Sequence, residues 1–337
     1  MKQIIYISNS ESKNIEAWNL YEDGNMELIQ KIETMGHVQP IAIIKDKNLL
    51  YAGVRPNNRI ITYLIDNNGL LKKKGESMIP GSPNHISFNT EKNFLFCSSY
   101  HSNCISVSPL NKNGIPKNPI QIIHNIQGCH ASQFNKKYKI LFVTSLKNNR
   151  IYLYYLTDFG ILKSTEQKFI SSKSQSGPRH ITFDTNENFA YTINELNGTI
   201  DVWKICQENI ILKVKNIQNI KLSIQNLERQ YWSADIHVTS CGKFLYASDR
   251  HLNTISLFHI HKHNNTLIFI KEYNTEEQPR SFCIDLNNKY LIVTGQKSNK
   301  LSIYKICKKT GELKKINQYL TGLGPLWITP FLIKISK

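Results

Sequence analysis

The sequence contains no long apolar run. None of its 337 residues lies in a stretch that reaches the roughly 18 apolar residues a membrane helix needs. The N-terminal segment Met1–Ser8 is largely apolar but meets Asn9 and Ser10 at once. It is too short for the hydrophobic core of a signal peptide and is typical of a β-strand. We therefore expect a cytoplasmic protein with no membrane partner.

The sequence also lacks paired cysteine motifs. Its seven cysteines are odd in number, and no two show the C-x-x-C spacing of zinc or redox sites. This pattern supports neither a disulfide framework nor a zinc site. We expect reduced thiols, no metal and no cofactor. The cysteines are Cys97, Cys104, Cys129, Cys206, Cys241, Cys283 and Cys307.

Acidic residues are scarce. Lys and Arg number 42 against 25 Asp and Glu, which leaves a net charge of +17. The lysines are spread over turns such as 135–137 and 308–309, and no helix face, arm or recognition motif collects them. We therefore expect no nucleic-acid partner, although the charge can attract an anionic small substrate.

An internal repeat organises the chain. A short polar or proline-containing start, followed by an apolar strand, recurs at intervals of roughly 45 to 55 residues, which is the range of a propeller blade. The repeat is found at residues 39–43, 83–88, 129–132, 178–183, 234–238, 279–284 and 325–328.

Further strands follow each start. A second strand is exemplified by Tyr51–Arg55, a third by Ile60–Tyr63, and a fourth follows a glycine or asparagine turn, as at Gly311–Ile316. These β-branched and aromatic runs, separated by turn residues, indicate hairpins. Four antiparallel strands per unit make a propeller blade.

The two ends of the chain complete each other. Residues 4–7 match a second strand and 15–18 a third, whereas 325–328 form a first strand with nothing after it. Pairing the C-terminal strand with the N-terminal strands would leave no open edge. We predict an all-β, seven-bladed propeller in one domain, 1–337, closed by this pairing, with 206–231 as its one irregular insert.

A polar site is predicted at one mouth of the central channel. A blade's first strand lies next to the channel and its second strand runs antiparallel beside it. The starts of first strands and the ends of second strands therefore meet at the same mouth. The ionisable and amide side chains at these positions are Arg55, His85, His130, Arg179, His180, Glu195, Asp235, His237, Arg250, Arg280, Gln296 and Lys297.

Two interpretations of this set remain open. Any one of these residues could belong to an arginine–carboxylate network that locks neighbouring blades. Cations outnumber anions in the whole set, however, so a network of protein groups alone would leave positive charge unbalanced. An anionic ligand would balance it.

Several motifs together resemble the propeller lactonase family. The likeness covers nearly the full chain, and the combination is more specific than any single triplet. In the fungal carboxy-muconate lactonising enzyme of this family, a His, two Arg and a Glu are implicated. The matching motifs are Gly128-Cys129-His130-Ala131, Gly177-Pro178-Arg179-His180, Asn194-Glu195-Leu196, Asp249-Arg250, Gln278-Pro279-Arg280 and Gly324-Pro325-Leu326-Trp327.

The resemblance implies an activity and a set of roles. The reaction would be hydrolysis of 6-phospho-D-glucono-1,5-lactone, with His130, Arg179, Glu195 and Arg250 as catalytic residues. Glu195 or His130 would be the general base and Arg179 would stabilise the oxyanion. Arg250 and Arg280 would hold the phosphate, since the guanidinium fork suits phosphate oxygens. The remaining residues of the set, Arg55, His85, His180, Asp235, His237, Gln296 and Lys297, would line the substrate site.

Alternatives to this activity are a related lactonase, a muconate-type cycloisomerase, and a non-catalytic propeller that binds proteins. Trp18 is followed by Asn19 and Trp203 by Lys204, so the W-D signature of scaffold propellers is absent. No G-x-S-x-G nucleophile motif occurs, which disfavours covalent catalysis. We expect a monomer acting on a small phosphorylated sugar lactone.

Overall fold

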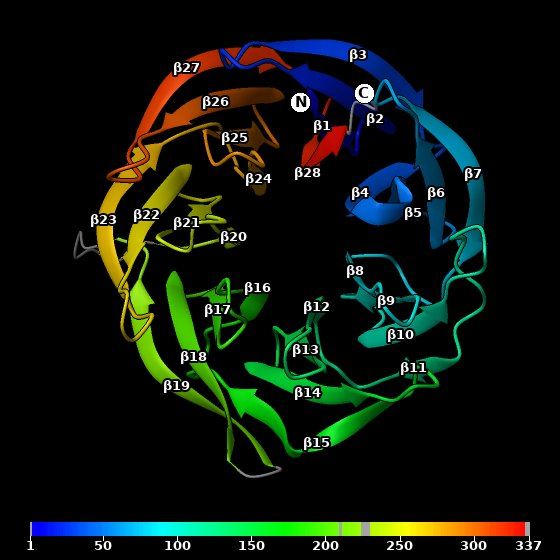
Figure 1. Cartoon of the computed structure of the whole chain (residues 1–337), viewed down its shortest axis with the longest axis vertical. Helices are drawn as coiled ribbons and strands as arrows, with labels where there is room; N and C mark the ends of the chain where they lie inside the picture. The colour runs from blue at the N-terminus through cyan, green and yellow to red at the C-terminus, as the bar shows by residue number, and fades with distance from the viewer. Residues whose placement is uncertain (1, 209–210, 224–229, 334–337) are drawn as a thin grey trace.

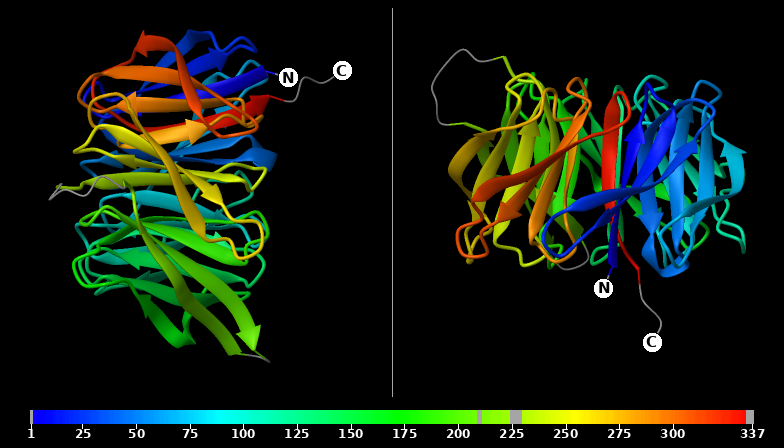
Figure 2. Two further views of the ribbon diagram at one scale, coloured as in Figure 1. Left: turned by 90° about the vertical axis from the view of Figure 1, so that its left-hand side faces the viewer. Right: turned by 90° about the horizontal axis from the view of Figure 1, so that it is seen from above.

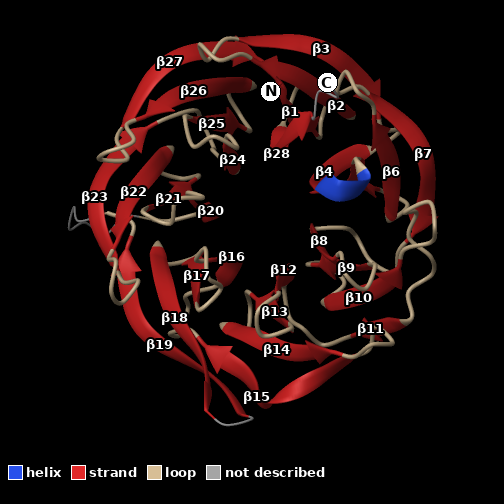
Figure 3. Ribbon diagram, viewed as in Figure 1, coloured by secondary structure: helices blue, strands red, loops and turns tan. Residues whose placement is uncertain are grey.

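The computed structural model describes residues 2–208, 211–223 and 230–333. In it, seven sheets of four antiparallel strands stand around a central channel (Figure 1). The prediction of an all-β, seven-bladed propeller is therefore confirmed. Strands dominate the ring, and the single helical turn among the described residues is η1 (Lys45–Lys47), shown in blue in Figure 3. The described residues form no helix long and apolar enough to cross a membrane.

Each blade runs from an inner strand at the channel to an outer strand at the rim. From inner to outer, the sheets are β28 (Pro325–Ile333), β1 (Lys2–Asn9), β2 (Asn14–Leu20), β3 (Met26–Glu33); β4 (His37–Ile44), β5 (Leu49–Arg55), β6 (Arg59–Ile65), β7 (Leu71–Met78); β8 (His85–Asn89), β9 (Phe94–Ser99), β10 (Cys104–Pro109), β11 (Gln121–Ile123); β12 (Cys129–Asn135), β13 (Ile140–Ser145), β14 (Arg150–Leu156), β15 (Leu162–Ser171); β16 (Pro178–Phe183), β17 (Phe189–Asn194), β18 (Thr199–Glu208), β19 (Ile211–Lys221); β20 (Ser233–Val238), β21 (Phe244–Asp249), β22 (Thr254–Ile260), β23 (Leu267–Asn274); and β24 (Ser281–Ile284), β25 (Tyr290–Gly295), β26 (Lys300–Ile306), β27 (Leu313–Leu320).

The ring closes as the sequence predicts. The C-terminal strand β28 pairs antiparallel with β1, and Ile4 lies opposite Phe331. Pro330 is tolerated in β28 because this innermost strand hydrogen-bonds only to β1, so the missing N–H can face the channel. Lys2 at the start of β1 pairs with Ile333 at the end of β28, and these strand ends lie at one face of the disc (Figure 2). First strands begin, and second strands end, on the other face.

Apolar side chains of adjacent sheets form the core between blades. One such layer joins Ile4 and Tyr6 of the first blade to Leu50 and Val54 of the next. A recurrent hydrogen bond ties neighbouring blades at this level, since a second-strand tyrosine donates to a glycine carbonyl in the outer hairpin of the following blade. The pairs are Tyr6 with Gly69 at 2.9 Å, Tyr51 with Gly114 at 2.7 Å and Tyr246 with Gly311 at 2.6 Å.

The glycine in these hairpins is required by conformation and by space. Gly114 has φ +79°, and a Cβ there would lie 2.2 Å from Cδ1 of Leu49. A larger residue would therefore be strained in its backbone and would displace the core side chain of the neighbouring blade.

The predicted irregular insert at 206–231 is wrong over its first half. Strands β18 and β19 extend through it as a long hairpin, with register pairs up to Glu208 opposite Ile211. Leu212 and Val214 of its outer strand are buried, but a register shift opposite Val202 and Trp203 and the polar residues beyond Val214 interrupt the alternation. Residues 209–210 and 224–229 of the insert lie outside the described residues.

Bulges recur where inner strands start. An extra residue in one strand of a pair bends the strand and turns a side chain that would otherwise point the other way. Such irregularities re-aim the residues at the channel mouth. Register shifts occur between Val38 and Ile41, Cys129 and Ser132, Pro178 and His180, and Ser233 and Ile236.

Candidate active site

Two separate cavities lie along the channel axis. The mouth cavity, of about 320 Å³, opens where first strands start, and the channel cavity, of about 150 Å³, lies deeper among the inner strands. The mouth cavity is lined by Gln39, Arg55, Asn84, Tyr100, His101, His130, Glu195, Trp232, Arg250 and Arg280. The channel cavity is lined by His85, Gln133, His180, Ile181, Thr182, Asp235, Ile236, His237, Ser281, Trp327 and Ile328.

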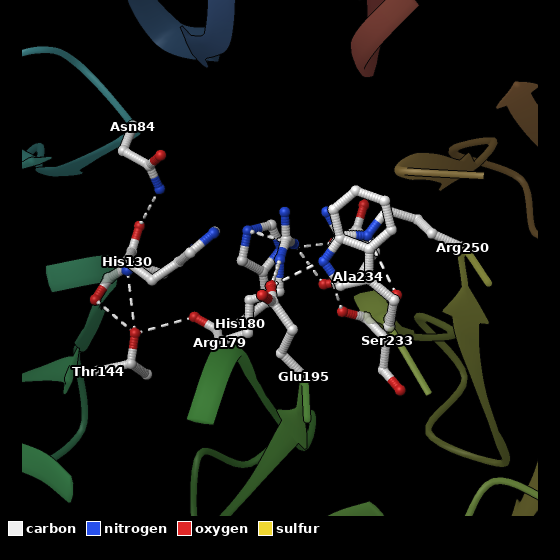
Figure 4. Close-up of polar contacts among 12 residues, drawn as sticks. Asn84, His130, Thr144, Arg179, His180, Glu195, Ser233, Ala234 and Arg250 are labelled. Carbon is white, nitrogen blue, oxygen red and sulfur yellow. Dashed lines mark hydrogen bonds and ion pairs between the residues drawn. The ribbon is translucent and has the colours of Figure 1, made fainter. Parts of the chain in front are cut away.

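Glu195 is the central anion of the mouth cavity. It directly follows β17, and its carboxylate is 14 % exposed. Oxygen Oε2 accepts from Nε of Arg179 at 2.9 Å and from Nη2 of Arg250 at 2.8 Å. Figure 4 shows Glu195 between these arginines, with His130 approaching from the β12 side and Arg250 from the β21 side. Oε1 has no hydrogen bond among the described residues, so it can accept from a ligand.

Arg179 lies beneath the cavity floor. The bulge at the start of β16 turns its side chain inward, where it is 1 % exposed. Besides Glu195, it donates to the carbonyl of Ala234 and to Nε2 of His180. Burial lowers the pKa of this guanidinium, although Glu195 partly offsets the effect. Arg179 is not among the residues that line the mouth cavity, and its contacts are with Glu195, Ala234 and His180.

Arg250 is held by backbone and by an aromatic ring. Its Nε donates to the Trp232 carbonyl at 3.1 Å and its Nη2 to the Ser233 carbonyl at 3.2 Å. The guanidinium carbon lies 3.9 Å from the centroid of the Trp232 ring. Burial, reinforced by Arg179, lowers the pKa of Arg250 to about 9. Nη1 has no partner among the residues described, so one edge of a rigidly oriented cation remains for a ligand.

His130 contributes a neutral imidazole. It follows Cys129 at the start of β12, and its backbone carbonyl accepts from Asn84 at 2.8 Å. Burial, together with the cations Arg179 and Arg280, holds the pKa of His130 well below its usual range. Its Nδ1 is buried and has no hydrogen-bond partner in the described part of the chain. A buried ring nitrogen without a hydrogen-bond partner is costly to the fold.

Arg55 and Arg280 carry the unbalanced positive charge. Arg280 forms no side-chain hydrogen bond or ion pair with any described residue, and burial together with Arg179 and Arg250 holds its pKa well below its ordinary value. Arg55 donates to Gln39 and, at 3.3 Å, to the Pro83 carbonyl, but its buried Nε has no partner among described residues. Both line the mouth cavity, so an anion bound there would meet unpaired guanidinium donors.

The deeper predicted residues form a second cluster. Asp235 accepts from Nδ1 of His180 at 2.8 Å and pairs with Nε2 of His237 at 3.2 Å. Burial opposes ionisation of Asp235, but His237 and the hydrogen bond from His180 outweigh it and hold its pKa well below the usual range. The ring of Trp327 lies 5.6 Å from His85 and 5.5 Å from His180, so it packs within the channel.

The sequence-predicted set therefore does not meet at a single point. Arg55, His130, Glu195, Arg250 and Arg280 share the mouth cavity, with Arg179 beneath it. Positions further along an inner strand lie deeper in the channel, which places the remaining histidines and the aspartate in the other cavity. Gln296 is half-buried, Lys297 is exposed, and neither lines either cavity. The residues assigned to the channel cavity are His85, His180, Asp235 and His237.

Sequence reasoning missed part of the mouth cavity. Tyr100 directly follows β9, at the position that Glu195 and Arg250 occupy in their own blades, so the same positional rule could have found it, and His101 is the next residue. Trp232 directly precedes β20 but lies just past the segment interpreted as an insert. The described residues contain no group of three or more His, Cys, Asp or Glu arranged to hold a metal ion.

Comparison with known proteins shows the family of this chain. The family described as "Lactonase, 7-bladed beta-propeller" matches residues 4–330. A 6-phosphogluconolactonase of Buchnera aphidicola subsp. Schizaphis graminum is 70 % identical over 333 residues, covering 99 % of this chain and 100 % of that protein. A 6-phosphogluconolactonase of Erwinia tasmaniensis is 38 % identical over 328 residues, covering 97 % of this chain and 98 % of the relative.

A solved structure shares the fold. The periplasmic gluconolactonase of Pseudomonas aeruginosa superposes with a TM-score of 0.91 at 17 % identity, covering 99 % of this chain and 100 % of that one. At this identity the likeness establishes the propeller architecture alone.

Proposed function

This chain belongs to the seven-bladed β-propeller lactonase family, and we propose that its mouth cavity hydrolyses 6-phospho-D-glucono-1,5-lactone to 6-phospho-D-gluconate, the lactonase step of the oxidative pentose phosphate pathway. The observation that carries the proposal is the mouth cavity itself. It combines a carboxylate and a neutral imidazole with arginine donors that no described residue satisfies.

The phosphate is assigned to Arg280 and Arg55. Both have donors that lack partners in the described chain, whereas Arg250 is committed to Glu195 and to two backbone carbonyls. A phosphate dianion would neutralise the repulsion among the arginines at the mouth. The fork geometry of guanidinium suits phosphate oxygens. This assignment moves Arg250 away from the phosphate role expected from the sequence.

Water attack on the lactone carbonyl requires a base and an electrophile. A ring nitrogen of His130 takes the proton of the attacking water, and the free edge of Arg250 stabilises the negative charge that develops on the carbonyl oxygen. Collapse of the tetrahedral intermediate breaks the bond between the carbonyl carbon and the ring oxygen. His130 returns the proton to that oxygen, which leaves a hydroxyl group and a carboxylic acid, and the acid releases its proton to solvent to give the carboxylate.

Glu195 has a supporting role in this scheme. Its Oε2 fixes Arg250 and Arg179, while its free Oε1 accepts a hydrogen bond from the attacking water or from a sugar hydroxyl. The phosphate would also raise the basicity of His130, because it offsets the field of the arginines that now lowers the pKa of this imidazole. Phosphorylated substrate would thus activate the base that attacks it.

The test is a coupled assay. Purified protein is supplied with 6-phosphogluconolactone, and 6-phosphogluconate formation is followed above the spontaneous rate. Glu195→Gln and His130→Gln should each reduce kcat by about 100-fold or more while the fold persists. Wild-type protein that does not exceed the spontaneous rate would overturn the activity. Near-normal turnover in both variants would overturn only the assigned roles.

The same proposal includes the oligomeric state and the cellular compartment of the enzyme. We infer a monomer of one domain acting in the cytosol. Free thiols at all seven cysteines support a reducing compartment, since no disulfide joins any of them. Size-exclusion chromatography with light scattering tests the oligomeric state, and fractionation tests the compartment.

A further inference from the structure

A hydrogen-bonded chain links the mouth cavity to the interior of the ring. From Oε2 of Glu195 it passes to Nε of Arg179 at 2.9 Å, and from Nη1 of Arg179 to Nε2 of His180 at 3.0 Å. It continues from Nδ1 of His180 to Oδ1 of Asp235 at 2.8 Å. The chain crosses from β16 and β17 of one blade to β20 of the next, and none of its last three members lines the mouth cavity.

The hydrogen-bonded chain allows only one tautomer of His180. A guanidinium has donors and no acceptor, so Nε2 of His180 must accept from Arg179. The proton of a neutral ring is then on Nδ1, where Asp235 accepts it. Burial, reinforced by Arg179, lowers the pKa of His180 to about 4, which is consistent with a neutral ring.

Asp235 is itself held from several sides. Its Oδ2 accepts from the Ser281 hydroxyl at 2.9 Å and from the Phe282 N–H at 3.3 Å, both of β24, and it pairs with His237. Its Oδ1 also accepts from the N–H of Ile236 at 3.1 Å. The carboxylate is thus anchored by a third blade, that of β24, which holds this end of the hydrogen-bonded chain rigidly.

We propose that His180 and Asp235 are positioning residues of the lactonase site, which act through Arg179 to hold Glu195 and hence Arg250 in their working orientation. The inference rests on the proposed function and extends it to two residues that do not touch the substrate. It replaces the substrate-binding role that the sequence suggested for this pair. Without the Nδ1–H tautomer, Nε2 would carry a proton directed at Arg179, and the guanidinium would have to move.

A purely blade-locking role would give different results from a positioning role. Both predict that breaking the network lowers stability. Only positioning predicts that kcat falls in fully folded protein, and that the effect disappears once Arg179 is absent. The experiment is therefore a double-mutant cycle on kcat, measured well below the melting temperature of every variant, with circular dichroism to confirm the fold.

The variants are Asp235→Asn, Arg179→Ala and the double variant. Asp235→Asn alone should reduce kcat for 6-phosphogluconolactone by about 10- to 100-fold with little change in KM, because a displacement of about 1 Å in a catalytic group has effects of that size. In the Arg179→Ala background the same substitution should change kcat by less than about twofold. Equal fold-losses in both backgrounds would refute action through Arg179.

Asp285→Asn is the matched control. Asp285 is 2 % exposed, and its carboxylate accepts from Nε2 of Gln3 at 3.0 Å and from the N–H of Asn287 at 3.1 Å, in the turn between β24 and β25 at the far end of the ring. This control should lower thermal stability and leave kcat unchanged. If Asp235→Asn behaves in the same way, with intact activity in a less stable protein, the pair only locks the blades.

Conservative replacement at His180 and a direct measurement of its tautomer complete the test. Gln can present an oxygen to Arg179 and an amide N–H to Asp235, so His180→Gln should retain at least about tenfold more activity than His180→Phe. Long-range ¹H–¹⁵N NMR of the wild-type protein should show a protonated Nδ1 and an unprotonated Nε2. An Nε2–H tautomer would overturn the inference even in an enzyme that hydrolyses the lactone, whereas absent lactonase activity would overturn the proposed function instead.

Discussion

Replacing Arg280 separates phosphate recognition from structural support. Arg280 has no side-chain partner among the described residues and stands in the field of Arg179 and Arg250. Its removal costs no hydrogen bond or ion pair with a described residue, and the repulsion from Arg179 and Arg250 that it relieves outweighs the lost attraction to Glu195. We therefore expect Arg280→Gln to leave the melting temperature unchanged or slightly higher.

Activity should respond differently for two substrates. A hydrogen bond to a charged group contributes about 1.5–3 kcal/mol. At about 1.4 kcal/mol per factor of ten, the loss in kcat/KM for 6-phosphogluconolactone is about 10- to 150-fold. For unphosphorylated glucono-1,5-lactone, which offers Arg280 nothing to bind, kcat/KM should change by less than about threefold on the same reasoning.

Both rates are measured by following acid release in weak buffer, with the spontaneous opening of each lactone subtracted. Arg150→Gln is the control, because Arg150 starts β14 outside both cavities and stacks at 4.2 Å on Phe169. It should alter neither substrate's rate. Equal fold-losses of Arg280→Gln on both lactones, or a marked loss of thermal stability, would refute the phosphate assignment.

Three other results are expected. The free energy of unfolding should fall by about 2 kcal/mol or more between about pH 7 and about pH 5, because burial keeps the folded-state pKa of His85 at about 3 and that of His180 at about 4. Histidine in the unfolded chain has a pKa of about 6.5, so the unfolded chain takes up protons first. Urea titrations at both pH values measure this change, and a flat profile would contradict it. Iodoacetamide should alkylate the exposed Cys307, because hydrogen bonds from Thr310 lower the pKa of this thiol, but should not alkylate the buried Cys129 beside His130. Activity should therefore persist, and mass spectrometry of the treated, folded enzyme measures the modification. Modified Cys129 in active protein would be the contrary result. Phe331→Ala should destabilise the protein by about 3–5 kcal/mol in denaturant titrations, because the Phe331 side chain is 4 % exposed and packs in the strand that closes the ring. Leu323→Ala is the control and should have little effect, because Leu323 is 52 % exposed. Equal effects of the two substitutions would contradict a stabilising role of ring closure.

Much of the fold follows from local patterns in the sequence. Strand periodicity, turn residues and a repeat of regular length are properties of neighbouring residues, and they suffice for the seven blades and for the pairing of β28 with β1. The long hairpin of β18 and β19 was missed because the buried Leu212 and Val214 are followed by a register shift and by mostly polar residues, which interrupt the alternation of the outer strand. Local patterns identify an element only where one of its faces is buried.

The site was predictable as a collection of residue types at strand ends, and this rule correctly brings Glu195, Arg250 and His130 to one mouth. Depth within the channel and the direction of each side chain were not predictable from spacing. The bulge at the start of β16 buries Arg179 beneath Glu195, and His180 and Asp235 lie in a different cavity from the one they were expected to line. Such outcomes depend on contacts between blades some 55 residues apart in sequence, as between His180 and Asp235.

The sequence by itself determined the repeat, the closure and the residue types at the mouth, because these depend on the order of residues. Only the tertiary structure decided which arginine is satisfied and which remains free, because that depends on the partners that distant strands bring to each guanidinium.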